Sequence, residues 1–295
     1  MDSIPRVRPG GLRGCLGLAI LLGAGWIATL NLLALARESW TPALYLALHG
    51  GLLCALGTAL GALPVLLVRD MSARVADSLL GFGAGVMLSA SAFSLILPAL
   101  QAAGDAGHPA WMAGVQVSAA LCLGALTIAV LGRLLERGRS EVERTAADAI
   151  PSRILLFVLA IVLHNIPEGM AVGVAAGGEV AGASGLALGI ALQDAPEGLA
   201  IALVLAGAGM SRGRAVLIGA ASGLVEPIFA VLCAALVGVG HLFLVGGLGA
   251  AAGAMLYVVA REVIPESQRR GYAAEATVGL LLGFCLMMVL DTSLG

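Results

Sequence analysis

Long apolar runs follow one another along almost the whole chain, and short segments between them hold most of the charged residues. An α-helix of about 20 apolar residues crosses a bilayer core of about 30 Å. The pattern predicts nine such helices, at residues 14–36, 43–68, 76–100, 111–132, 153–177, 183–207, 214–239, 241–261 and 274–294. These helices leave no room for a separate soluble domain, so we expect an all-α polytopic membrane protein with one membrane domain over residues 1–295.

The composition supports this interpretation. Of the 295 residues, 60% are hydrophobic and 12% are charged, whereas soluble domains carry about 25% charged residues. So little charge cannot cover the surface of a water-soluble fold, which excludes a soluble enzyme, a nucleic-acid-binding protein and a disordered chain. The five cysteines are scattered singly through apolar stretches, and we interpret them as buried small hydrophobes.

The first apolar stretch could be a signal peptide or a retained helix. Arg6, Arg8 and Arg13 precede it, as in a signal peptide. However, residues 14–36 exceed the roughly 7–15 residues of a signal-peptide apolar region. We therefore expect an extra N-terminal transmembrane helix ahead of a core at residues 43–294.

The arginines predict the orientation of the chain in the membrane. All 16 basic residues are Arg, and with the N-terminus in the cytoplasm all of them except Arg37 fall in cytoplasmic segments. Because cytoplasmic segments of membrane proteins are enriched in basic residues, we expect a cytoplasmic N-terminus and an external C-terminus. The longest connection, residues 133–152, is charged and is predicted to be a cytoplasmic loop.

Polar side chains interrupt three of the apolar spans at one depth. They are His164, Asn165 and Glu168 in the fifth span, Gln193, Asp194 and Glu197 in the sixth, and Ser222 and Glu226 in the seventh. At about 1.5 Å per residue, His164, Asp194 and Glu226 each lie roughly 17–18 Å from the start of their helix, near the bilayer midplane. Ionisable groups at that depth are costly and usually mark a pathway or a site. The three helices are therefore predicted to share one site.

Two of these spans carry a repeated motif. HNIPEGMA (164–171) and QDAPEGLA (193–200) match in chemical type at every position. In each, the glutamate follows polar residues by three and four positions, which places all of them on one helix face. Because the two helices run in opposite directions, the repeat indicates a pseudo-two-fold axis in the membrane plane, which is typical of transporters.

A proline lies next to each polar cluster, at Pro167, Pro196 and Pro227. Proline removes an intrahelical hydrogen bond and frees a carbonyl four residues earlier. The carbonyls predicted to be freed are those of Leu163, Leu192 and Gly223. Broken membrane helices are tolerated where the backbone lines a cavity, so we expect kinks that suit a metal pocket.

The charge of the cluster indicates what it binds. Glu168, Asp194, Glu197 and Glu226 have no basic residue near them in these spans, so they must hold protons or bind cations. Two divalent ions would balance the four carboxylates. The mixture of imidazole, carboxylate and amide favours a borderline metal such as Zn(II) or Fe(II) over Ca(II) or Cu(I). A purely structural hydrogen-bonding role explains one such residue better than it explains five.

Other polar residues have two possible interpretations each. Met87 could add a thioether ligand or fill space in the core. Ser94 could line a pathway or bond to its own helix, and Asp291 could attract cations or be a solvated helix-end acid. Glu262 and Glu266 could form an exit or pair with nearby arginines.

These residues resemble the ZIP (Zrt/Irt-like) family of divalent-metal transporters, in particular its bacterial GufA-like branch. The motifs that carry the resemblance are HNIPEGMA (164–171), QDAPEGLA (193–200), SGLVEP (222–227), GFGAGVMLSASAFSLILP (81–98) and EVIPE (262–266). The resemblance covers the chain from about residue 45 to its end. It implies an eight-helix core with an inverted repeat, here with the extra N-terminal helix. It also implies a homodimer and import into the cytoplasm by an elevator-like motion of one helix bundle against another.

The resemblance further implies a binuclear site. The first metal would be held by Met87, His164, Glu168, Gln193 and Glu197. The second would be held by Asn165, Glu168, Asp194, Glu197 and Glu226, with Glu168 and Glu197 bridging. Two departures concern metal exit: residues 133–152 contain no His where family members often have a His-rich loop, and Arg261 stands where relatives often have His.

The resulting hypothesis is a carrier in the bacterial inner membrane that imports Zn(II) and related ions such as Cd(II), Fe(II) or Mn(II). It would have no enzymatic activity and no nucleic-acid partner. One alternative is an intramembrane metalloenzyme with Glu168 or Glu197 as general base, although the chain has no HExxH motif. Another is a proton or cation channel that uses the same acids; saturable, metal-selective flux would distinguish the carrier from the channel.

Overall fold

In the computed structural model, the described residues are 41–67, 71–145 and 150–294, and every regular element among them is a helix. The predicted span 14–36 lies outside these residues. The elements are α2 (Pro42–Ala62), η1 (Leu63–Leu66), α3 (Ala73–Ser89), η2 (Ala90–Ile96), α4 (Leu97–Asp105), α5 (Ala110–Thr145), α6 (Ile150–Gly177), α7 (Ala183–Gly207), α8 (Arg212–Ser222), α9 (Val225–Val237), α10 (His241–Val258), η3 (Val259–Val263), α11 (Ile264–Ser267) and α12 (Ala273–Leu294).

The helices confirm the prediction of an all-α polytopic membrane protein. Within the described residues, seven helical stretches are long and apolar enough to cross a membrane. They are Pro42–Leu66, Ala73–Asp105, Ala110–Leu134, Ala183–Gly207, Arg212–Val237, Leu242–Ser267 and Ala273–Leu294. The helix α6 covers the remaining predicted span of the core, residues 153–177.

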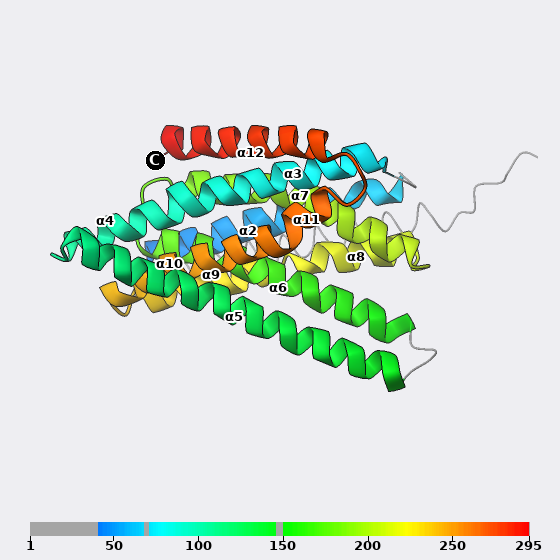
Figure 1. Ribbon diagram of the computed structural model, residues 1–295, viewed down its shortest axis with the longest axis horizontal. Coiled ribbons are helices and arrows are strands. Elements are labelled where there is room, and N and C mark those ends of the chain that lie inside the picture. Colours follow the sequence, from blue (N-terminus) through cyan, green and yellow to red (C-terminus); the bar gives the residue numbers. More distant parts are fainter. Residues whose placement is uncertain (1–40, 68–70, 146–149, 295) are drawn as a thin grey trace, which may run out of the picture.

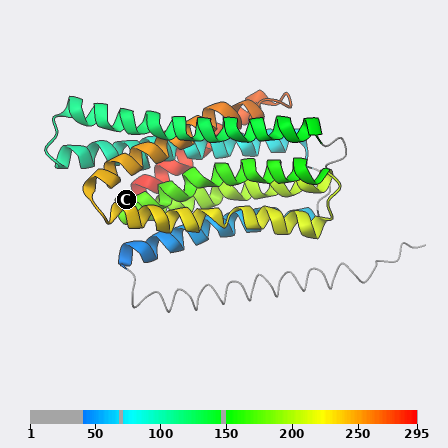
Figure 2. The same ribbon diagram turned by 90° about the horizontal axis from the view of Figure 1, so that it is seen from below.

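The helices run side by side along the long axis of the molecule (Figure 1). The helix α2 packs along α7 and α9, and α6 packs along α9 and also contacts α2 and α10. On the other side, α12 packs along α3, and α5 packs along α10. Figure 2 shows α2 (blue) and α5 (green) on opposite sides of the bundle. The polar helices α6 and α7 therefore lie in its interior.

Glycines allow α2 and α7 to approach each other closely. A Cβ atom on Gly57 would lie 2.2 Å from the carbonyl oxygen of Ala191, and one on Gly61 would lie 1.9 Å from that of Ala195. Small residues at such crossings let helix backbones touch in a membrane. These two contacts lie on either side of Gln193 and Asp194, so they hold the polar turn of α7 directly against α2.

Most of the segment predicted to be a cytoplasmic loop is helical. The helix α5 continues to Thr145, and α6 begins at Ile150, so only a short connection separates them within residues 133–152. Hydropathy marks where a helix leaves the apolar region, not where it ends. Leu, Glu and Arg, which are frequent in this segment, are good helix formers, and the helices extend accordingly.

The prolines behave differently from one another. Pro167 and Pro196 lie inside α6 and α7, which continue through them. Pro227 instead lies in the first turn of α9, just after a break between α8 and α9. A first-turn proline loses no helical hydrogen bond, and the carbonyl of Gly223 accepts the backbone N–H of Glu226 at 3.1 Å. The prediction of a freed carbonyl at this residue is therefore wrong.

Two π-helical segments were not predicted from the sequence. The segment η2 continues α3 toward Pro98, and η3 continues α10 toward Pro265. π-helical turns are uncommon and occur frequently at functional sites. Here they carry Ser94 and Glu262, two of the polar residues for which the sequence left two interpretations open.

The close contact between α2 and α7 can be tested by Gly57→Ala. The added methyl group must push the helices apart, and overpacking of this kind costs about 1–3 kcal/mol. We expect a lower midpoint of thermal unfolding for the detergent-purified protein. The control is Gly114→Ala in α5, where a Cβ atom meets no other atom within 4 Å. Equal midpoints for the two variants would contradict the packing described here.

Candidate metal centre

The polar residues of the fifth, sixth and seventh predicted spans come together in the interior of the bundle. The side chains of Glu168 and Glu226 are fully buried, and Asp194 is 1% exposed. Asn165 and Gln193, from α6 and α7, are buried with them. Taking several carboxylates out of water costs several kcal/mol for each charge unless a partner compensates it. The centre therefore needs protons or cations.

Two groups of ligating atoms lie close enough to hold an ion. Single carboxylate oxygens of Glu168, Asp194 and Glu197 lie within 4.8 Å of one another. The Cys54 Sγ and single oxygens of Asp194 and Glu226 meet the same limit. Because Asp194 belongs to both groups, the two groups adjoin inside the bundle.

Two amide side chains hold the acids in place. Gln193 Nε2 donates to Glu168 Oε1 and to Asp194 Oδ1, the latter at 2.6 Å. Asn165 Nδ2 donates to Glu226 Oε1 at 3.2 Å. A hydrogen bond to a charged group is stronger than one between neutral groups. The amides thus fix one oxygen each of Glu168, Asp194 and Glu226 and leave the other oxygen available.

Several buried oxygens of the centre accept no hydrogen bond from the described residues. They are Asn165 Oδ1, Glu168 Oε2, Asp194 Oδ2 and Glu226 Oε2. Leaving such an acceptor unsatisfied costs about 1–3 kcal/mol. Carboxylate and amide oxygens are also ligands for divalent cations. The donor set and its unsatisfied atoms fit a metal ion.

His164 and Met87 reach the centre from one side. Both line a cavity of about 460 Å³, together with Gln193 and Glu197. His164 Nε2 lies 3.6 Å from Glu262 Oε2 across this cavity. His164 belongs to neither of the two groups of close ligand atoms. The structure therefore places the predicted imidazole and thioether ligands beside the acids, on the wall of the cavity.

The cavity leads toward the arginine-bearing end of the bundle. Met87, at its inner end, is 1% exposed, whereas the side chains of Glu262 and Arg269, also in its wall, are 48% and 67% exposed. In Figure 1, α3 and α8 begin and α11 ends toward the right, while the C-terminus lies at the left. The centre is therefore connected to the end opposite the C-terminus.

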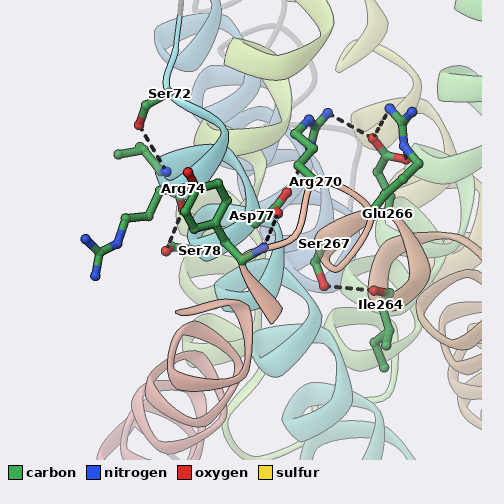
Figure 3. Close-up of polar contacts among 11 residues, drawn as sticks. Ser72, Arg74, Asp77, Ser78, Ile264, Glu266, Ser267 and Arg270 are labelled. Carbon is green, nitrogen blue, oxygen red and sulfur yellow. Dashed lines mark hydrogen bonds and ion pairs between the residues drawn. The ribbon is translucent and has the colours of Figure 1, made fainter. Parts of the chain in front are cut away.

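Ion pairs extend from Glu266 and Arg269 in the cavity wall to the neighbouring Arg270 and Asp77 (Figure 3). Glu266 accepts hydrogen bonds from Arg269 Nε at 2.7 Å and from Arg270 Nη2 at 2.9 Å. Arg270 Nη1 also donates to Asp77 Oδ1 at 3.0 Å, and Asp77 is fully buried in α3. Glu266 is thus paired with arginines, which confirms one of the two interpretations given for it. Glu262 instead lies in the cavity wall beside His164.

On the opposite side of the centre, Ser94 and Asp291 are paired. The Ser94 hydroxyl donates to Asp291 Oδ1 at 2.6 Å, which joins η2 to α12. Ser94 therefore does not bond to its own helix. Two isolated histidines make only nearby contacts: His49 Nδ1 lies 2.9 Å from the Tyr45 carbonyl oxygen, and His108 contacts a glutamine of the next helix.

The contribution of α2 to the centre was not predicted from the sequence. Thr58 Oγ1 donates to Glu226 Oε1 at 3.3 Å, and Cys54 belongs to the second ligand group. The two residues lie one turn apart in a span that is mostly apolar. The i,i+4 spacing of these two weakly polar side chains could have indicated that α2 contributes to the centre. Such residues are less conspicuous in an apolar span than a charged residue is.

The interpretation of the cysteines as buried hydrophobes holds in part. Cys54 is buried, but Cys122 and Cys285 are exposed and Cys233 is half-buried. The exposed cysteines lie on α5 and α12, whose outer faces are apolar. An apolar stretch predicts a membrane span, but it does not predict which side of the helix faces the protein. Cys15 lies outside the described residues.

Comparison with known proteins agrees with the motifs. A family model described as "ZIP Zinc transporter" matches residues 136–291. The zinc transporter ZIPB of Bordetella bronchiseptica is 45% identical over 100% of this chain and 94% of its own. The zinc transporter GufA of Myxococcus xanthus is 40% identical over 84% and 98%, and human zinc transporter ZIP11 is 33% identical over 81% and 94%. With such matches along most of its length, the chain belongs to the ZIP family of zinc transporters.

Proposed function

We propose that this chain imports Zn(II) through the bacterial inner membrane into the cytoplasm by way of the buried carboxylate centre. The observation that carries the proposal is the pair of adjoining ligand groups that share Asp194. Among the described residues, one carboxylate oxygen each of Glu168, Asp194 and Glu226 has no hydrogen-bond donor. The names of the relatives support zinc as the ion. Zinc binds the nitrogen and oxygen ligands found here.

In this proposal the centre binds two ions. The first is held by Met87, His164, Glu168, Gln193 and Glu197, and the second by Asn165, Glu168, Asp194, Glu197 and Glu226. The close approach of Glu168, Asp194 and Glu197 supports shared carboxylates. Two divalent ions neutralise the four carboxylates, which removes the cost of burying them unpaired. The same ligand types also accept Cd(II), Fe(II) and Mn(II).

The cavity and the arginines support the proposed orientation of the chain in the membrane. The cavity runs from the centre to the end of the bundle at which Arg261 and Arg269 lie. By the positive-inside rule this end is cytoplasmic, with the N-terminus inside and the C-terminus outside. On the other side of the centre, the hydrogen bond between Ser94 and Asp291 joins η2 to α12. The fold thus corresponds to an inward-facing conformation.

Alternating access is proposed to move one bundle against another. The helices α2, α6, α7, α8 and α9 pack together around the centre, while α12 packs along α3 and α5 along α10. The first set carries all the acids of the centre. Sliding that set outward past α3 and α10 would carry the ions with it and expose the centre to the outer side.

Glu262 is proposed to receive the departing ion. Its carboxylate lies 3.6 Å from His164 Nε2 and is partly exposed in the cavity wall. An ion that exchanges an imidazole ligand for this carboxylate moves toward water without losing all its protein ligands. Stepwise exchange of this kind keeps the desolvation cost low.

The chain as a whole is proposed to form one membrane domain, residues 1–295, and to act as a homodimer. The helices α5 and α12 expose large apolar side chains, among them Trp111, Leu126 and Leu282. Such faces suit lipid or a second copy of the chain. The homodimer follows from the family resemblance, and these faces are compatible with it.

Loss of a central carboxylate should abolish transport. We expect Glu168→Gln, and likewise the double variant His164→Ala/Glu168→Ala, to lower Zn(II) uptake into proteoliposomes by about tenfold or more, since each removes a ligand from the centre. The matched control is Glu179→Gln, at an exposed glutamate in the turn between α6 and α7. A folded wild-type protein that binds zinc but gives no uptake would contradict the carrier and favour an intramembrane metalloenzyme.

The proposed orientation can be tested with single cysteines in a chain whose own five cysteines are replaced by Ser. Ala106→Cys and Gln268→Cys lie at exposed positions at opposite ends of the bundle. In intact cells, a membrane-impermeant maleimide should label Ala106→Cys and leave Gln268→Cys unlabelled until the cells are opened. The reverse pattern would place the cavity on the outer side and overturn the proposed orientation.

A further inference from the structure

One cysteine lies among the acids of the centre. Cys54 is fully buried in α2, and its Sγ lies within 4.8 Å of single oxygens of Asp194 and Glu226. Its thiol donates a hydrogen bond to the Ala187 carbonyl oxygen at 3.5 Å. Three elements far apart in sequence, α2, α7 and α9, therefore bring one sulfur and two carboxylates to the same point.

The two carboxylates beside Cys54 each keep a free oxygen. Asp194 Oδ1 accepts from Gln193, and Glu226 Oε1 accepts from Thr58 and Asn165. In contrast, Asp194 Oδ2 and Glu226 Oε2 are buried and have no hydrogen-bond partner among the described residues. These unsatisfied oxygens are a second sign, independent of the cysteine, that this point holds a cation.

The surroundings of Cys54 differ from those of a packing cysteine. Buried free cysteines usually behave as small hydrophobes in apolar surroundings. The half-buried Cys233 in α9 has such apolar surroundings, because Met170, Val174 and Phe243 line the cavity beside it. Cys54 instead faces two acids, an arrangement that favours metal binding over packing.

We propose that Cys54 is a sulfur ligand of the second metal position, where it favours Cd(II) and Zn(II) over Mn(II). This inference rests on the proposed function, and it adds a ligand from α2 to the set taken from the family motifs. Thiolates bind zinc and softer ions well, whereas Mn(II) prefers oxygen ligands. The thiol proton is released as the metal–sulfur bond forms.

The direct test is Cd(II) binding followed by ultraviolet absorption, because a cadmium–sulfur bond gives a charge-transfer band that oxygen ligands do not give. The main sample is the full chain in which Cys15, Cys122, Cys233 and Cys285 are replaced by Ser, so that Cys54 is the remaining thiol. It is compared with three single variants of the otherwise unchanged chain: Cys54→Ser, Cys54→Ala and the matched control Cys233→Ser. Each protein is first checked for a single monodisperse peak on size exclusion.

We expect the band in the Cys54-only protein and in Cys233→Ser, and its loss in Cys54→Ser and Cys54→Ala. In proteoliposomes, Cys54→Ser should lower the preference for Cd(II) over Mn(II) by about tenfold, the order of change that an altered ligand environment produces.

Two results would overturn the inference in different ways. Cd(II) binding and zinc uptake without a band in the Cys54-only protein would show that sulfur takes no part, while the proposed function would stand. Absence of both metal binding and uptake in folded wild-type protein would remove the proposed function and this inference together.

Discussion

The burial of negative charge decides how the interior of this bundle is arranged. Glu168, Asp194 and Glu226 lie almost completely out of contact with solvent, and no arginine of the chain lies in the apolar part of these three helices. Asn165 and Gln193 compensate part of the charge through hydrogen bonds. The unsatisfied oxygens that remain require a cation or a proton. A carrier needs this property, since its binding site must be unsatisfied without its cargo.

Close backbone contact makes such a centre possible. Gly57 and Gly61 let α2 touch α7 on either side of its polar turn. In the same way, a Cβ atom on Gly169 would lie 2.6 Å from the carbonyl oxygen of Glu226, so α6 and α9 touch beside their glutamates. Short polar side chains can meet across helices only when the backbones are this close. These glycines therefore serve the geometry of the centre as much as helix packing in general.

The centre was more predictable from the sequence than its surroundings. Depth along each span was enough to place His164, Asp194 and Glu226 at one level, because helix rise is constant and ionisable residues in apolar spans are conspicuous. The contribution of Cys54 was missed, since one sequence does not show which face of a uniformly apolar helix meets the polar helices. The helix break before Pro227 was missed as well, because a proline in the first turn of a helix and one in its middle look alike in a hydropathy pattern.

The sharing of Glu168 and Glu197 by the two proposed metal positions bears on how ions move in the proposed mechanism. At the same separation, two divalent ions repel each other about four times as strongly as two unit charges. Carboxylates that contact both ions offset this repulsion, so filling both positions is feasible only while the acids stay together. If the bundle of α2 and α6–α9 moves as one body, the acids keep these contacts throughout the motion, and the charge of the cargo remains compensated while it crosses the membrane.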